Sequence, residues 1–176
     1  MIPFRIHTQK SLDECTACAI SAIAEDKLQV AIDPDYLYSN SKDSDFGIKP
    51  TTALQTAINR GLKVLNTGEI IYPFKDYRRI WGWFNLFGQI VKALDDGPVF
   101  CGCYWQGECD NSSFIKLPIE WLNLGGHAFK IYGTVEVNGI LYLKIQNSRG
   151  TNIGDNGIWY APKEVVNKFL FAYQLL

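Results

Sequence analysis

A run of small and apolar residues near the start of the chain requires one helix to lie in the interior. From Cys15 to Glu25 the sequence reads CTACAISAIAE, and its only charged residue is the last one. A surface helix would carry a broad polar face, and this run has none. We therefore predict a helix over 15–25 that is buried on nearly all sides, with the rest of the chain packed around it.

The residues before Cys15 predict that this helix begins at or near the cysteine. Ser11 and Glu14 have the spacing of a capping box, and Asp13 and Glu14 place negative charge where a helix start favours it. The positive end of a helix stabilises a thiolate. The position of Cys15 thus favours its ionisation, whereas the adjacent carboxylate of Glu14 opposes ionisation unless it points to solvent.

Proline and glycine predict further helices. Pro34 begins a short helix, and Pro50 begins a longer one that stops before Gly61. The apolar spacing over 89–94 predicts another helix, which ends at the turn residues that follow it. The polar stretch 40–47 is predicted to be a loop.

An aromatic run in the middle of the chain allows two interpretations. Its members are Tyr77, Trp81, Trp83, Phe84 and Phe87. Aromatic anchors dominate many interfaces, which would make the run a binding surface. Aromatic side chains also fill cores, and we favour packing between two lobes.

The cysteines are expected to be reduced. The chain has five of them and no export signal, so at least one is unpaired and a disulfide framework is not expected. Cys15 with Cys18 and Cys101 with Cys103 form two close pairs, which is also the pattern of a zinc site. Cys101 and Cys103 lie in an alternating strand-like run, however, where both point to one face of a sheet. We favour buried thiols and expect no metal and no cofactor.

The second half of the chain is predicted to be mostly strand. Asn138-Gly139 separates two apolar runs and is the strongest short-range signal for a two-residue hairpin turn. An unbroken register from this turn would set Asn147 opposite Lys130 and leave His127 on the other face of the sheet. It would also split the apolar residues between the two faces.

One extra residue in the first strand of the hairpin removes this conflict. A bulge between Ile131 and Val135 moves Asn147 opposite Phe129 and restores a shared apolar face. His127 and Asn147 then become diagonal neighbours, with Cβ atoms about 7–8 Å apart or less, so that their side chains can meet. We predict this bulge.

Charge and hydropathy limit the classes of partner. The 176 residues carry a formal net charge of -1, so no strong field attracts nucleic acid or an anionic membrane. No apolar stretch approaches the ~18 residues of a membrane span, and the N-terminus lacks the features of a signal peptide. We expect one soluble cytoplasmic domain that binds neither nucleic acid nor membrane. The oligomeric state is not predicted.

Three short motifs place reactive and polar side chains in a defined order. Gln9 begins QKSLDECTA, which contains Cys15; His127 lies in GGHA; and Asn147 begins NSRGT. The motifs and their order resemble the papain-like cysteine peptidases, in the short bacterial or phage-like form without a propeptide. Weaker matches extend the resemblance to nearly the whole chain, at 33–38, 49–54 and 94–99.

This resemblance implies an α+β fold with two lobes in one catalytic domain over 1–176. A helical lobe at about 9–84 would hold the buried nucleophile helix. A β lobe at about 85–176, with an N-terminal strand at 1–8, would form an antiparallel, barrel-like sheet. The polar loop at 40–47 would let a substrate lie extended against the backbone.

The resemblance also implies a cysteine endopeptidase that acts on peptide or protein substrates. The Cys15 thiolate would attack the carbonyl carbon, and the His127 imidazolium would donate the proton to the leaving amine. Asn147 would orient the imidazole ring. The side-chain amide of Gln9 and the backbone amide of Cys15 would face the oxyanion.

Two residues depart from the family pattern. Arg149 stands where relatives usually have tryptophan, which puts the apolar shield over the histidine–asparagine bond in doubt and would let Arg149 bind a substrate carboxylate. Glu14 replaces a small residue before the nucleophile. Weakened chemistry would leave a peptide-binding domain, and the same side chains also suit an amidase or acyltransferase.

Each candidate also has a structural interpretation. Cys15 could be a core thiol, with Cys18 as the alternative nucleophile. His127 could be a core histidine whose ring nitrogens are satisfied. Asn147 could be a turn residue and Gln9 a solvated surface residue.

Overall fold

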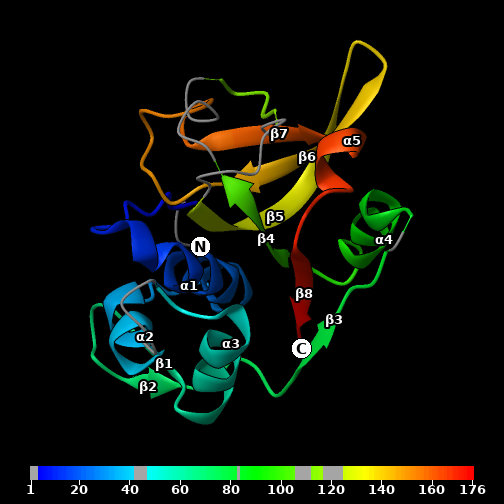
Figure 1. Cartoon of the computed structure of the whole chain (residues 1–176). Helices are drawn as coiled ribbons and strands as arrows, with labels where there is room; N and C mark the ends of the chain where they lie inside the picture. Colours follow the sequence, from blue (N-terminus) through cyan, green and yellow to red (C-terminus); the bar gives the residue numbers. More distant parts are fainter. Residues whose placement is uncertain (1–3, 42–46, 83, 106–111, 117–124) are drawn as a thin grey trace.

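A computed structural model describes residues 4–41, 47–82, 84–105, 112–116 and 125–176. Within these residues, helices gather beside a six-stranded antiparallel sheet (Figure 1). The sheet has the order β3-β8-β4-β5-β6-β7, and a small second sheet pairs β1 with β2. The sheet strands are β3 (Tyr77–Arg79), β4 (Val99–Trp105), β5 (Gly125–Val137), β6 (Ile140–Gln146), β7 (Ile158–Pro162) and β8 (Phe171–Leu175). The α+β prediction is confirmed.

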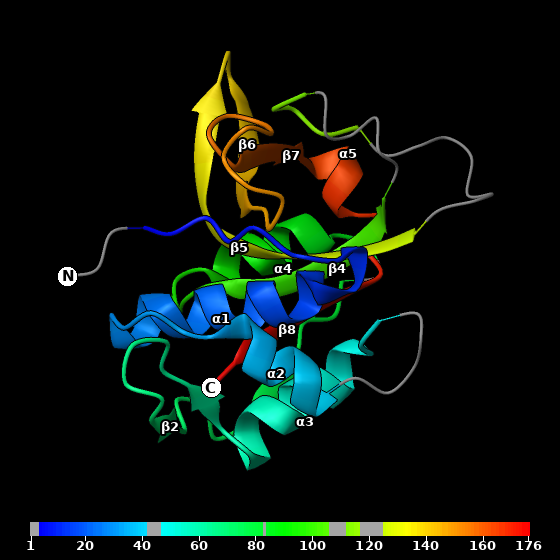
Figure 2. The ribbon, with the colours of Figure 1, turned by 90° about the vertical axis from the view of Figure 1, so that its left-hand side faces the viewer.

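The interior helix forms where the small-residue run predicts it. Helix α1 (Cys15–Leu28) is buried from Cys15 through Glu25 and lies between the large sheet and two other helices (Figure 2). It ends at Gln29, whose left-handed backbone lets its N–H reach the carbonyl of Glu25.

The capping-box prediction at this helix start is wrong. A short 3-10 helix, η1 (Leu12–Glu14), precedes α1, and the Ser11 side chain makes no capping hydrogen bond. The Glu14 carboxylate instead accepts a hydrogen bond from the backbone N–H of Lys10 at 2.5 Å. The tight turn of η1 therefore replaces the reciprocal side-chain bonds of a capping box.

The other helices begin and end close to the proline and glycine residues that predicted their boundaries. Helix α2 (Pro34–Ser41) and helix α3 (Pro50–Asn59) both begin at proline, as predicted. Gly61 has φ of 75°, and a Cβ there would come within 2.6 Å of the Ile71 carbonyl oxygen, so glycine is needed where α3 gives way to β1 (Leu62–Lys63). Strand β2 is Ile70–Ile71, and α5 is Lys163–Val166.

Helix α4 (Leu86–Ala93) begins three residues earlier than the predicted start at Gln89. The Asn85 side chain accepts a hydrogen bond from the N–H of Gly88 at 3.1 Å and so caps the helix. Asparagine is a favoured N-cap residue, and this signal fixes the earlier boundary.

The predicted hairpin and bulge are both present. Asn138 and Gly139 have positive φ, and β5 pairs with β6 directly from the turn. The register shifts between Ile131 and Gly133, where Tyr132 is the extra residue. Ile131 consequently lies opposite Ile145 inside one core, and both are fully buried.

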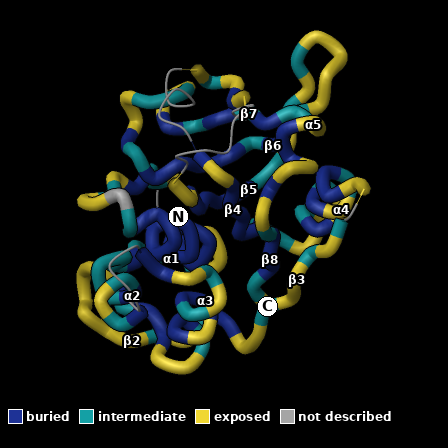
Figure 3. Tube along the Cα trace, viewed as in Figure 1, coloured by how far each residue is buried: buried dark blue, intermediate teal, exposed yellow. Residues whose placement is uncertain are grey.

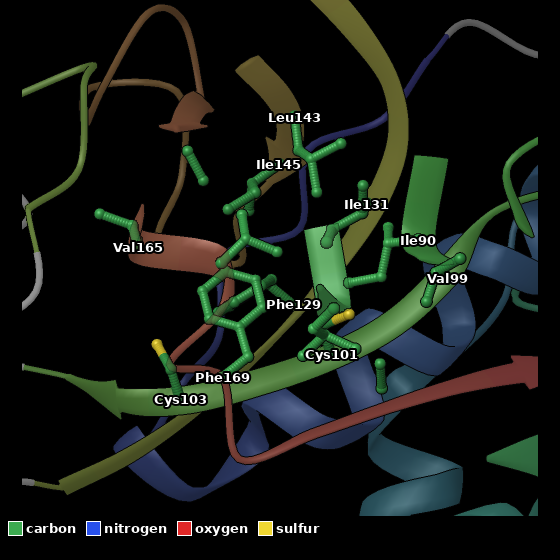
Figure 4. Close-up of a cluster of buried hydrophobic side chains, with 14 of the residues drawn as sticks. Ile90, Val99, Cys101, Cys103, Phe129, Ile131, Leu143, Ile145, Val165 and Phe169 are labelled. Carbon is green, nitrogen blue, oxygen red and sulfur yellow. The ribbon is translucent and has the colours of Figure 1, made fainter. Parts of the chain in front are cut away.

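Two apolar clusters lie on opposite faces of strand β4. Cys101 and Cys103 enter the cluster formed with α4, α5 and strands β5 to β7 (Figure 4). Phe100 enters the cluster around α1 and α3. Both α1 and β4 are buried along most of their length (Figure 3). The prediction that Cys101 and Cys103 are buried on one face is confirmed. Cys15 belongs to the cluster on the other face.

The prediction that the aromatic run is core is wrong for two of its members. Phe87 is buried and Tyr77 is partly buried, but Trp81 is 59% exposed and Phe84 is 96% exposed. Both follow β3, which lies at an edge of the sheet, in the connection that leads to α4. The Arg79 guanidinium covers the Trp81 ring at 4.1 Å. Trp83 lies outside the described residues.

The described N-terminal segment pairs with the chain after β6. Thr8 forms an isolated antiparallel bridge with Arg149, and residues 4–7 are not in a strand. Residues 1–3, and residues 42–46 of the predicted polar loop, lie outside the described residues. The lobe boundaries stay a prediction. None of the helices in the described part of the chain is long and apolar enough to cross a membrane.

Candidate active site

The packing of α1 on β5 brings the Cys15 thiol to His127. Cys15 occupies the first position of α1, and the backbone N–H of Ala128, next to His127 on β5, donates to its Sγ at 3.4 Å. Cys15 and His127 are 112 positions apart in the sequence. The hydrogen bond joins Cys15 Sγ to Ala128, the residue that follows His127. Two candidates that the sequence placed in separate motifs thus lie at one site.

A buried lysine holds the same helix against the same strand. Lys130 is 1% exposed, and its Nζ donates to the carbonyl oxygen of Ala22 at 3.2 Å and pairs with Asp26 Oδ2 at 2.6 Å. Burial lowers the pKa of Lys130, and the Asp26 carboxylate opposes that shift. The ion pair fixes α1 along β5 and thereby fixes Cys15 beside His127.

Cys15 and His127 line one cavity of about 310 Å³. Two larger cavities, of about 500 and 390 Å³, contain neither residue. The wall combines the start of α1 with the start of α3, the β4–β5 pair and the approach to β8. Its lining residues are Asp13, Cys15, Thr16, Gly47, Ile48, Pro50, Cys103, Gly126, His127, Ala128, Leu170 and Phe171.

Burial acts on the pKa values of both reactive groups. Burial raises the pKa of Cys15, although the Ala128 N–H, hydrogen bonds with Thr16 and the positive charge of Arg149 oppose the rise. Burial, followed by the charge of Arg149, lowers the pKa of His127 to about 3. Each group taken alone is therefore favoured in its neutral form.

Aromatic side chains surround the His127 ring. The Trp105 ring lies 4.9 Å from it between centroids, the Trp159 ring 5.9 Å and the Phe129 ring 6.0 Å. Trp159 is fully buried and Trp105 is 5% exposed. Strands β4, β5 and β7 thus supply an apolar cover for His127, although Arg149 stands where the resemblance led us to expect tryptophan.

The sequence analysis missed Trp105 and Trp159. The alternation of β4 contained the signal for Trp105, because Cys101, Cys103 and Trp105 share one face of a strand. No comparable signal ties Trp159 to the histidine, since that contact depends on the register of β6 with β7.

Asn147 lies where the bulged register predicts it, but it is not hydrogen-bonded to His127. The β5–β6 pairing ends with Lys130 opposite Gln146, as the bulged register requires, and Asn147 is the next residue after β6. The Asn147 Oδ1 accepts a hydrogen bond from the N–H of Arg149 at 2.5 Å. The buried Nδ2 of Asn147 and Nε2 of His127 both lack hydrogen-bond partners among the described residues.

Gln9 is held outside the cavity lining. Its Nε2 donates to the Ser11 carbonyl oxygen at 2.8 Å, and its Oε1 accepts from the Ser148 hydroxyl at 2.6 Å. Its backbone N–H donates to the carbonyl oxygen of Ser148 at 2.7 Å. Gln9 is therefore tied to the segment that carries Asn147, and its Nε2 is engaged by the Ser11 carbonyl oxygen.

The alternative nucleophile and the alternative base lie elsewhere. Cys18 is 1% exposed, and burial together with the Glu14 carboxylate raises its pKa. His7 is buried with its Nε2 3.1 Å from Glu25 Oε2. Neither residue lines the cavity that contains Cys15. Glu14 is 8% exposed and thus does not point to solvent.

No model of a known protein family matches the sequence, and a comparison with curated proteins gives no match either. Solved structures do match. The structure of xylellain, a cysteine protease from Xylella fastidiosa, superposes with a TM-score of 0.78 at 19% identity, over 99% of this chain and 83% of that one.

Two plant proteins give similar superpositions. The bromelain protease from Ananas comosus, solved with the E64 inhibitor, has a TM-score of 0.75 at 15% identity, covering 97% of this chain and 92% of that one. The proform of the ragweed pollen cysteine protease Amb a 11 has a TM-score of 0.78 at 14% identity, covering 97% and 61%. The chain has the fold of the papain-like cysteine proteases.

Proposed function

We propose that this chain is a cysteine endopeptidase in which Cys15 is the nucleophile and His127 the general acid and base. The observation that carries the proposal is the shared cavity of the two residues, with the Ala128 N–H 3.4 Å from the Cys15 sulfur. Peptide or protein would be the substrate, in keeping with the protease neighbours of the same fold.

The proposed reaction is an acyl transfer. The Cys15 sulfur attacks the peptide carbonyl carbon to form a C–S bond, and the proton that it gives up to His127 passes to the leaving amine. Water then attacks the thioester, again with His127 as the base, and the acid product leaves. Burial opposes either charge alone, but a thiolate and an imidazolium in contact stabilise each other and titrate as one pair.

Asn147 and Gln9 have supporting roles in this proposal. A carbonyl oxygen has two lone pairs, so Asn147 Oδ1 can accept from the His127 ring while keeping the Arg149 N–H. Gln9 Nε2 would exchange the Ser11 carbonyl for the oxyanion. The Cys15 backbone N–H would be the second donor, and loss of one such donor typically costs about 3 kcal/mol of transition-state stabilisation.

Digestion of an unbiased peptide library, read by mass spectrometry, tests the proposal. We expect internal cleavage by the wild type, loss of all cleavage in Cys15→Ala and retention in Cys18→Ala. A wild type that leaves peptides intact but hydrolyses muropeptides or transfers acyl groups would replace the peptidase proposal with that of an amidase or acyltransferase. Binding of peptide without turnover would indicate a peptide-binding domain.

A further inference from the structure

Asp13 is a wall residue of the candidate active site whose role no motif explains. It lies two residues before Cys15 in η1, is half-buried and lines the same cavity. Since consecutive Cα atoms are 3.8 Å apart, its Cα is within about 7.6 Å of that of Cys15. Asp13 is therefore close enough to contact a substrate side chain next to the carbonyl that Cys15 would attack.

A glycine, Gly47, lies beside the Asp13 carboxylate. A Cβ added to Gly47 would lie 3.5 Å from Asp13 Cβ and 3.6 Å from its Oδ1. A larger side chain at that position would therefore extend over the carboxylate. Gly47 also has φ of 102°, a backbone conformation that favours glycine for itself.

The Asp13 carboxylate is the one charged side chain of the cavity wall within the described part of the chain. Its neighbours in the wall include the apolar side chains of Ile48, Pro50, Leu170 and Phe171. The nearby acids are already engaged, because Glu14 accepts from the Lys10 N–H and Asp35 pairs with Lys10 Nζ. Asp13 has no hydrogen bond or ion pair with any other residue that the structure describes.

We propose that Asp13 selects substrates with an arginine or lysine side chain next to the scissile bond. The carboxylate would bind the cationic head, and the apolar wall would contact the methylene stem, as long basic side chains commonly bind. Substrates with an acidic residue at that position would be repelled. This inference rests on the proposed peptidase function and adds the class of substrate.

Matched peptides with arginine or citrulline test the charge without changing the shape. After library profiling has located the favoured position, kcat/KM is measured for both peptides with the wild type, Asp13→Asn and the control Asp95→Asn. Asp95 is exposed and lines a different cavity, so its loss changes net charge alone. We expect a preference for arginine of about tenfold, equal to about 1.4 kcal/mol, that falls to about one in Asp13→Asn and persists in Asp95→Asn.

A binding measurement separates this inference from the proposed function. Cys15→Ala and Cys15→Ala/Asp13→Asn are titrated with the same two peptides by calorimetry, which needs no turnover. If Cys15→Ala binds the arginine peptide more tightly than the citrulline peptide, and Cys15→Ala/Asp13→Asn does not, the role of Asp13 is supported even for a protein that cleaves nothing. Equal preference in the presence and absence of Asp13, by kinetics or by binding, would overturn the inference while leaving the peptidase proposal intact.

Discussion

The two halves of the candidate site are built in different ways. Cys15 and His127 are positioned by regular elements, because α1 packs on β5 and the Lys130–Asp26 pair holds them together. Gln9 and Asn147 lie outside the regular elements, in two segments that are joined by several hydrogen bonds, including those from the Gln9 N–H to the Ser148 carbonyl oxygen and from the Ser148 hydroxyl to Gln9 Oε1. The comparison teaches that regular elements bring the thiol and imidazole to one cavity, whereas the amide groups of Gln9 and Asn147 have other partners and would have to reorient for the roles that we propose.

The largest expected effect concerns the assembled half. His127→Ala is expected to lower kcat/KM for a cleaved peptide by about 10⁴-fold, the upper end for general acid–base catalysis, because no other histidine lines the described cavity. A continuous fluorogenic assay measures it. His7→Ala is the matched control and should retain more activity. Similar losses in both variants would show that unfolding, and not chemistry, explains them.

The next prediction concerns Gln9, whose side-chain amide would have to reorient to face the oxyanion. Gln9→Ala should lower kcat by about 10²-fold if its amide stabilises the oxyanion, with a smaller change in KM. Ser148→Ala removes the hydroxyl that holds Gln9 Oε1 and should cost less, since the amide itself remains. Wild-type kcat in Gln9→Ala would restrict Gln9 to a structural role.

Trp105 tests whether the cover over His127 is a packed part of the fold. Trp105→Ala should lower the free energy of unfolding by about 3 kcal/mol, because a buried aromatic ring leaves a cavity. Urea denaturation measures this loss. Trp81→Ala, at a tryptophan that is 59% exposed, should change stability little. Equal losses at the two positions would contradict the packing that we describe.

The smallest expected effect concerns Arg149 and the pKa values of Cys15 and His127. The positive charge of Arg149 lowers the pKa of both Cys15 and His127. Its removal in Arg149→Gln should therefore raise both, and the midpoint of thiol alkylation should move to higher pH. Arg60→Gln, at the residue that follows α3, is the control for net charge and should leave the midpoint unchanged. A midpoint that moves to lower pH would show that Arg149 does not act through its charge.

Local sequence patterns made the half of the site with Cys15 and His127 predictable. The small-residue run gives α1, and the turn at Asn138-Gly139 with the conflict of apolar faces gives the bulge beside Ile131. These patterns work because burial of one face determines both helix rotation and strand register.

The remainder depends on contacts between distant segments. Nothing local indicates that Gln9 Nε2 would choose the Ser11 carbonyl, or that the N–H of Arg149 would occupy Asn147 Oδ1. The exposure of Trp81 likewise follows from the position of β3 at the edge of the sheet, which its composition does not reveal.

The central claim is that His127 promotes ionisation of Cys15, and the pH dependence of alkylation tests it most directly. Rates of iodoacetamide modification at Cys15, mapped by mass spectrometry, are compared in the wild type, His127→Ala and Cys18→Ala. We predict that near about pH 6 the wild type and Cys18→Ala react faster than free cysteine, whose pKa is near 8.5, and that His127→Ala loses this excess. A wild-type rate no greater than that of free cysteine and unaffected by His127 would contradict the account.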